Sequence, residues 1–269
     1  MRIDLHVHST ASDGALPPEA VVRAARAGGL DLIAVADHDT TAGVAPATQA
    51  ADGLVVVPAV ELSTTFQDID LHLLGYFVDP QAPGLLRHAS IATERREQRI
   101  RGMLQLLERQ GLHVPMDAVR AAAGDAALAR PHLARAMVEV DAVPSINDAF
   151  DRFIGDRGPA FLPTFLPPPD QAIRLIHDAG GLAAWAHPPA SMLVTHIRSF
   201  ADLGLDAIEC FRPRASQAET ERALRIARQH HLLATGGSDW HGPWSGELGA
   251  FFLGLDDVGE FLRRGGVLA

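Results

Sequence analysis

Short apolar runs alternate along the chain with longer segments in which apolar residues recur at helical spacing. Each run has the length of a buried strand, and turn residues or a helix-like segment separate it from the next run. We predict strands at residues 3–7, 32–36, 54–60, 71–77, 182–186, 206–211 and 232–235. Because strands that alternate with helices build β/α units, the pattern predicts an α/β fold around a parallel sheet.

Three of the intervening segments carry helix signals. Residues 18–27 and 169–179 each begin with proline and are followed by a glycine pair, which is the asymmetry expected at the two ends of a helix. Residues 216–230 carry apolar side chains at helical spacing and charged side chains elsewhere. We predict a helix at each of these segments.

Residues 83–159 interrupt the alternation. This segment reads as a run of helices without an intervening strand, and the apolar residues of its first helix recur on one face. We therefore predict one barrel domain made of residues 1–82 and 160–269, with residues 83–159 inserted as a helical cap. A proline run at 167–169 is expected to lead back to the barrel.

Composition excludes several kinds of chemistry. Cys210 is the single cysteine among 269 residues, so neither a disulfide framework nor a multi-cysteine zinc or iron–sulfur site is expected. All 23 basic residues are arginines. Without lysine, the chain cannot form a Walker-type phosphate loop, a Schiff base or a carbamylated-lysine metal bridge.

Charge and the N-terminal sequence limit the partners. The net charge of −10 argues against broad adhesion to nucleic acid or an anionic membrane. The first residues resemble no signal peptide, and no apolar run is long enough to cross a bilayer. We expect a cytoplasmic protein that binds a small nucleotide substrate or short RNA, and neither a membrane nor duplex nucleic acid.

Candidate metal ligands recur near the ends of the predicted strands. His6 lies in the strand predicted at residues 3–7, and His8 directly follows that strand. Because the two residues stand two apart in extended chain, both side chains project to one side. That pair alone is as typical of surface or core histidines as of a metal site. Further histidines and carboxylates accompany later strands, namely His38, Glu61, His72, His187, Asp239 and His241. Because catalytic groups collect at the carboxyl ends of barrel strands, this recurrence predicts a metal site.

Several of these residues lie in short motifs with a fixed order along the chain. The motifs are His6-Val7-His8, Asp37-His38-Asp39, Glu61, Ala186-His187-Pro188 and Ser238-Asp239-Trp240-His241. With them, the sequence resembles the polymerase and histidinol phosphatase (PHP) superfamily of metal-dependent phosphoesterases. The segment from Ala129 to Arg135 in the cap makes the chain look most like its 3′,5′-nucleoside bisphosphate phosphatases.

The resemblance implies a distorted (β/α)7 barrel with an inserted helical cap and three divalent metal ions. It assigns His6, His8, Glu61 and Asp239 to the first ion, Glu61, His72 and His187 to the second, and Asp13, His38 and His241 to the third. The family often has a histidine where this chain has Asp13. Imidazole and carboxylate ligands suit manganese, iron or zinc, and we expect manganese.

The expected reaction is hydrolysis of the 3′-phosphate of a nucleoside 3′,5′-bisphosphate by a metal-bound hydroxide, giving a nucleoside 5′-phosphate and inorganic phosphate. We predict catalytic roles for His132, Asp239 and His241. His132 or a metal-bound water could protonate the departing sugar oxygen.

Arginines are the candidates for binding the second phosphate. The predicted substrate-binding residues are Arg130, His132, Glu209, Arg212 and Arg214. The planar guanidinium of an arginine can donate two parallel hydrogen bonds to a phosphate. Each arginine here could instead be solvated or belong to a surface ion pair. Glu209 could contact a ribose hydroxyl or an arginine.

Other reactive side chains have ordinary explanations. Trp240 and Trp244 could stack on a base or pack around the site. Cys210 is expected to be a buried, inert thiol. The isolated histidines are expected to be surface or structural residues, namely His88, His113, His177 and His196.

Three alternative functions remain open from the sequence. A 5′-to-3′ exoribonuclease acting on short 5′-phosphorylated RNA would need the same metal site. An amidohydrolase also carries a histidine pair on its first barrel strand, although the missing lysine argues against it. A non-catalytic metal-binding module is the third alternative.

Overall fold

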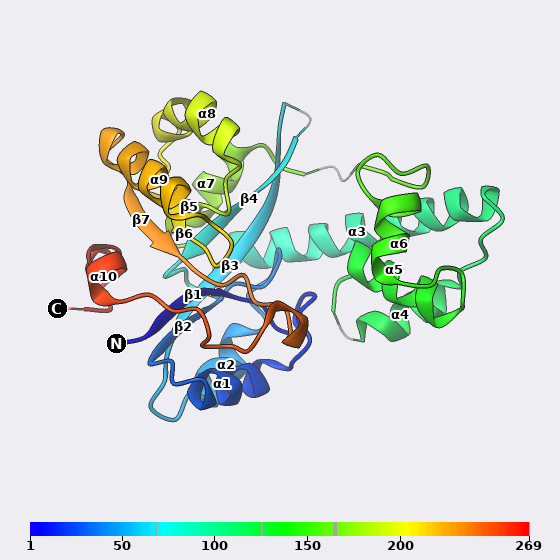
Figure 1. The fold of residues 1–269 in the computed structure, drawn as a ribbon, viewed down its shortest axis with the longest axis horizontal. Helices are drawn as coiled ribbons and strands as arrows, with labels where there is room; N and C mark the ends of the chain where they lie inside the picture. Colours follow the sequence, from blue (N-terminus) through cyan, green and yellow to red (C-terminus); the bar gives the residue numbers. More distant parts are fainter. Residues whose placement is uncertain (68, 125, 164–165, 269) are drawn as a thin grey trace. The chain divides into compact units, whose positions relative to one another are not determined.

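A computed structural model describes the chain except for residues 68, 125, 164, 165 and 269 (Figure 1). Its sheet has seven strands, and their order in the sheet is their order in the chain. The strands are β1 (Ile3–Val7), β2 (Leu32–Val35), β3 (Val55–Phe66), β4 (Ile69–Tyr76), β5 (Leu182–Trp185), β6 (Ala207–Phe211) and β7 (Leu233–Gly236). Each predicted strand is confirmed, and β3 extends further than predicted.

The predicted parallel arrangement is wrong at β4. This strand runs antiparallel to both β3 and β5, whereas the other neighbouring strands pair in parallel. The reason is a short connection, because β3 ends at Phe66 and β4 begins at Ile69, directly opposite it. A tight turn can join only antiparallel strands, since a parallel pair needs a long crossover.

The sheet curls so that its two edge regions meet. Val7 at the end of β1 forms a parallel bridge to Trp240, in the segment after β7. The backbone N–H of His8 donates to the carbonyl oxygen of Trp240 over 2.9 Å. The α/β barrel implied by the motifs is therefore confirmed, and the segments that follow β1 and β7 lie side by side.

Helices pack against this sheet (Figure 1). They are α1 (Pro18–Ala27), α2 (Val44–Gln49), α7 (Pro169–Asp178), α8 (Ala190–Asp202), α9 (Gln217–Gln229), α10 (Leu255–Arg264) and a 3-10 turn, η2 (Pro243–Ser245). Three of them confirm the helices predicted from proline, glycine and apolar spacing. At the start of α9, the Ser216 hydroxyl oxygen accepts a hydrogen bond from the backbone N–H of Glu219. This N-cap gives a partner to one of the backbone N–H groups that have no acceptor within the helix.

The inserted helices form a compact unit of their own, residues 89–165, while residues 1–88 and 166–269 form the other unit. The insertion predicted at residues 83–159 begins and ends slightly earlier in the chain than this unit does. Its elements are α3 (Pro83–Arg109), which begins before the boundary, α4 (Met116–Ala123), α5 (Arg130–Glu139), α6 (Ile146–Ala149) and the π-helix η1 (Phe150–Ile154). Ile100, Met103 and Leu133 belong to its separate apolar core.

Within the described part of the chain, no helix combines the length and apolar character needed to cross a membrane.

Candidate metal centre

All nine side chains predicted as metal ligands lie together in the unit formed by residues 1–88 and 166–269. Eight of them fall into three overlapping groups, and in every group the donor atoms lie within 4.8 Å of one another. His187 extends the same cluster, because its Nε2 atom lies 2.9 Å from Oε1 of Glu61. The groups are His6, His8, Glu61 and Asp239; His38, Glu61 and His72; and His8, Asp13, His38 and His241. Their roles as ligands remain predictions.

The strand directions explain how His72 joins the cluster. Most of the other members follow the carboxyl ends of parallel strands, where barrel sites collect. His72 instead lies in the first half of β4, opposite Ser63 in the second half of β3. Because β4 is antiparallel, its beginning lies beside the carboxyl end of β3, so His72 reaches the same edge of the sheet.

The first group is tightly packed around facing nitrogen and oxygen atoms. The Nε2 atoms of His6 and His8 lie 3.1 Å apart. Each lies 3.2 Å from Oε2 of Glu61, and they lie 3.4 and 3.2 Å from Oδ1 of Asp239. Donor atoms bound to one ion at about 2.0–2.2 Å would be separated by roughly these distances. The group therefore fits a single cation.

Glu61 connects two parts of the cluster through its two oxygen atoms. Its Oε2 atom faces His6 and His8, whereas Oε1 lies 3.0 Å from Nδ1 of His72 and 2.9 Å from Nε2 of His187. The two imidazoles approach each other to 3.3 Å. Oε2 also lies 3.1 Å from Nδ1 of His38. Each oxygen of Glu61 thus faces different neighbours, as the oxygens of a bridging carboxylate do.

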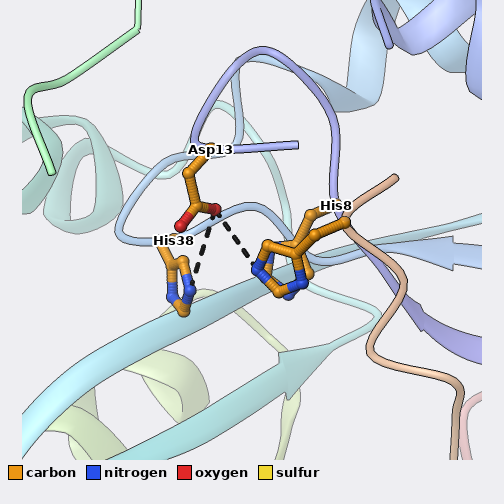
Figure 2. Close-up of side chains that lie close together, drawn as sticks. His8, Asp13 and His38 are labelled. Carbon is orange, nitrogen blue, oxygen red and sulfur yellow. Dashed lines mark ion pairs between the residues drawn. The ribbon is translucent and has the colours of Figure 1, made fainter. Parts of the chain in front are cut away.

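Asp13 lies close to the remaining predicted ligands, His38 and His241. Figure 2 shows its carboxylate pointing toward His38, with His8 beside them. Its Oδ1 atom lies 3.9 Å from Nε2 of His38 and 3.3 Å from Nε2 of His241. The His241 ring stacks on His8 with ring centroids 4.0 Å apart. Asp13, His38 and His241, which the sequence grouped around a third ion, are thus brought together.

Burial and charge divide the histidines into two kinds. Burial lowers the pKa of His8, but hydrogen bonds to Asp239 and Glu61 outweigh it and raise that pKa to about 10. Burial instead dominates at His38 and lowers its pKa to about 3. Burial would raise the pKa of Glu61, but the charges of His38 and His6 hold it well below its usual range. Without a metal, protons on histidine balance the carboxylates.

The cluster fits divalent ions on its own chemistry. Its donors are six imidazoles and three carboxylates, with no thiol among them, a set suited to manganese, iron or zinc. Nδ1 of His8 is buried and has no hydrogen-bond partner in the described structure. Nδ1 of His38 is also buried and lies 3.1 Å from Oε2 of Glu61 without forming a hydrogen bond. A metal ion can replace the protons that balance the carboxylates, because it binds histidine in the neutral form.

Backbone conformation at the site is unusual. His187 and Asp239 have φ angles of +29° and +54°, in the left-handed region that residues with a Cβ atom rarely adopt. Both are predicted ligands, and such strain persists where the surrounding structure fixes a functional geometry. The nearby Gly237 is required by close approach, because a Cβ atom there would lie 2.3 Å from Cβ of His6.

Glu209 supports the cluster from behind. Its Oε1 atom lies 2.9 Å from Nδ1 of His6, and its Oε2 accepts from the backbone N–H of His187 over 2.6 Å. The side chain is buried and is not among the residues that line the cavity described below. Its predicted contact with substrate stays a prediction, while these observed contacts are those of a residue that orients metal ligands.

Two aspartates that flank His38 were not singled out by the sequence reasoning. Asp37 accepts from the backbone N–H of Ser9 over 2.8 Å and from the hydroxyl of Ser12 over 2.7 Å, which holds the loop that carries Asp13. Asp39 lies 2.9 Å from Nε2 of His88, so the expectation that His88 is structural is refined to a contact beside the cluster. The signal was present in the Asp37-His38-Asp39 motif.

A cavity of about 450 Å³ opens beside the metal ligands. His187, Asp239 and His241 form part of its wall, and Arg212 and Arg214 form another part. The remaining lining residues are Pro213, Ala215, Glu219, Gly237, Ser238, Trp244 and Ser245. A volume of this size is within the range of small-molecule sites.

Comparison with known proteins places the chain in a family. A model of the PHP domain matches residues 4–107. The 5′-3′ exoribonuclease Rnm of Escherichia coli (strain K12) is 35% identical over 249 residues, which cover 89% of this chain and 85% of that protein. The chain belongs to the PHP family.

Two further comparisons agree. The 3′,5′-nucleoside bisphosphate phosphatase of Chromobacterium violaceum is 32% identical over 252 residues, covering 91% of the PHP chain and 88% of the relative. A solved structure from Bifidobacterium adolescentis, described as that of a metal-dependent phosphoesterase, has a TM-score of 0.88 at 30% identity and covers 97% and 96% of the two chains. This PHP protein is a metal-dependent phosphoesterase, as predicted. The names of both relatives describe enzymes that cleave phosphate esters.

Two predicted substrate-binding residues of the PHP chain lie in the inserted unit. Arg130 forms an ion pair with Asp156 over 2.5 Å. His132 is buried in the first turn of α5, where its Nδ1 accepts from the backbone N–H of Ala129 over 3.1 Å. Their proposed contacts with phosphate, and the catalytic role of His132, stay predictions.

Cys210 is buried in the apolar core of the PHP barrel. Burial raises the pKa of its thiol to about 12, and a thiol that stays protonated is neither a good nucleophile nor a good metal ligand. The structure agrees with the expectation of an inert cysteine.

Proposed function

We propose that this PHP protein removes the 3′-phosphate from nucleoside 3′,5′-bisphosphates, producing a nucleoside 5′-phosphate and inorganic phosphate. The observation that carries this proposal is a cavity that shares His187, Asp239 and His241 with the cluster and also presents Arg212 and Arg214. A phosphoryl group at the cluster and a second phosphate at the arginines suit a substrate with two phosphates on one sugar.

The proposed reaction divides its tasks among the residues of the chain. Bound divalent ions, three in our proposal and manganese by preference, would supply Lewis acidity and lower the pKa of water. Asp239 and His241 belong to both the cluster and the cavity wall, so they are suited to orienting water and the phosphoryl group. Water loses a proton and adds to phosphorus, the bond to the 3′-oxygen breaks, and that oxygen takes up a proton.

A second candidate is 5′-to-3′ cleavage of short RNA, which is favoured by the name of the relative with 35% identity. Both reactions break the same bond, between phosphorus and the 3′-oxygen of a 5′-phosphorylated nucleotide. They differ only in whether the phosphoryl group carries another nucleotide. The two candidates therefore share a leaving group, and only substrates that differ on the other side of phosphorus separate them.

The test compares adenosine 3′,5′-bisphosphate with a 5′-phosphorylated di- or trinucleotide, each with manganese, iron or zinc and with a chelator. We expect inorganic phosphate from the bisphosphate, no product from the oligomer and no reaction with the chelator. Mononucleotides released from the oligomer at a comparable rate would support the exoribonuclease instead. A His8→Ala variant purified in the same way controls for contaminating phosphatases.

A further inference from the structure

The two tryptophans near the last metal-ligand motif occupy different environments. Trp240 is 4% exposed, packs in the core and donates its Nε1–H to the carbonyl oxygen of Gly246 over 2.9 Å. Trp244, in η2, is 64% exposed and lines the cavity. The sequence left packing and base stacking open for both residues, and the structure places Trp240 in the core and Trp244 in the cavity wall.

The cavity combines an aromatic surface with cationic groups. Arg212 and Arg214 line it together with Trp244, and the predicted ligands Asp239 and His241 lie in the same wall. An indole face can carry any nucleobase, because each base has a π surface. Guanidinium groups bind phosphate. An aromatic platform, a phosphate-binding pair and a metal cluster are the parts needed to hold a nucleotide at a reacting phosphate.

Arg212 carries a nitrogen atom that lacks an acceptor among the described residues. Nε of Arg212 is buried and has no hydrogen-bond partner in the described structure. The acid in the same wall, Glu219, is engaged at the start of α9, where its Oε2 accepts from the backbone N–H and the hydroxyl of Ser216 over 2.8 and 2.7 Å. Because a buried donor without a partner is costly, an anionic oxygen in the cavity would be stabilised by Arg212.

We propose that this cavity binds the nucleoside 5′-phosphate part of the substrate, with the base stacked on Trp244 and the 5′-phosphate held by Arg212 and Arg214. The inference rests on the proposed function and deepens it, because it names the residue that selects nucleotides over base-free sugar phosphates. It applies equally to the exoribonuclease candidate, whose leaving group is the same nucleotide.

The kinetic test compares Trp244→Ala and Trp244→Phe with the unaltered metal-loaded protein. The substrates are adenosine 3′,5′-bisphosphate and a base-free ribose 3,5-bisphosphate. We expect Trp244→Ala to lower the ratio of kcat/KM for the nucleotide to that for the base-free substrate by roughly tenfold, mainly through KM. Trp244→Phe should recover most of the loss. The control is Phe252→Ala, an exposed aromatic outside the cavity lining, which should leave the ratio unchanged.

A binding test without turnover uses adenosine 5′-monophosphate and tryptophan fluorescence. Trp185 and Trp240 are buried, whereas Trp244 is largely exposed. We expect the nucleotide to quench fluorescence in the unaltered protein and to do so far less in Trp244→Phe, which keeps the buried tryptophans.

The outcomes separate this inference from the proposed function. Bisphosphate hydrolysis with an unchanged substrate ratio in Trp244→Ala would overturn the stacking role and leave the phosphatase standing. Undiminished quenching in Trp244→Phe would overturn it as well. Quenching that depends on Trp244, in a protein that releases no phosphate from the bisphosphate, would support the binding site and sink the proposed reaction.

Discussion

Nδ1 of His6 lies 2.9 Å from Oε1 of Glu209, and both side chains are buried. A carboxylate that accepts the Nδ1 proton fixes the tautomer of a histidine, so that its Nε2 lone pair faces outward. Here Nε2 of His6 faces Glu61 and Asp239, where its lone pair would be available to a metal ion. The same carboxylate holds the backbone of His187, so Glu209 is a positioning residue for two predicted ligands.

Changing Glu209 to glutamine should weaken metal binding without removing a ligand. A neutral amide is a poorer acceptor for the His6 proton, and loss of such a partner lowers metal affinity by about 10- to 100-fold. Metal titration followed by calorimetry measures the change. The matched control is Glu221→Gln on the exposed side of α9. Equal metal affinity in the two variants would show that Glu209 does not position His6.

Replacing His8 with alanine should abolish turnover through loss of metal. Its Nε2 atom is one of four donors that meet around a single position, and it is fully buried. Metal content by mass spectrometry should fall with activity, and His113→Ala, whose side chain is exposed on the inserted unit, should retain both. A His8→Ala protein with full metal content and normal turnover would contradict the assignment.

Gly237→Ala should distort the site and destabilise the fold. The added Cβ atom would lie 2.3 Å from Cβ of His6 and 2.4 Å from its backbone nitrogen, so backbone must move rather than a flexible side chain. Overpacking of this kind costs about 1–3 kcal/mol. Thermal unfolding measures the loss. At the control position Gly254 the nearest atom is 3.6 Å away, and Gly254→Ala should unfold near the parent temperature.

If Arg130 binds the second phosphate, as the sequence predicts, and not only Arg212 and Arg214, Arg130→Ala should raise KM for substrates with two phosphates more than for a simple phosphomonoester. The ion pair with Asp156 offers a structural explanation for the same arginine. Asp156→Asn distinguishes the two, because it removes the pair but keeps the guanidinium. If both variants lose stability equally and neither changes the ratio of KM values, Arg130 serves the fold of the insertion and not the substrate.

The fold could largely be predicted from local pattern. Apolar runs bounded by turn residues gave all seven strands, and proline or glycine at segment ends gave α1 and α7. The direction of β4 could not be predicted in this way, because direction depends on how β3 and β4 pair. Alternation of apolar residues is the same in parallel and antiparallel strands.

The sequence by itself determined which side chains could bind metal, since residue type and strand position identified eight of the nine predicted ligands and the family resemblance added Asp13. Only the tertiary structure decided how they share atoms: Glu61 faces different neighbours with its two oxygens, and Glu209 lies behind His6 and outside the cavity. It also separated Trp240, which packs in the core, from Trp244, which lines the cavity. These outcomes depend on distances between residues far apart in the chain, which only the packing of the barrel sets.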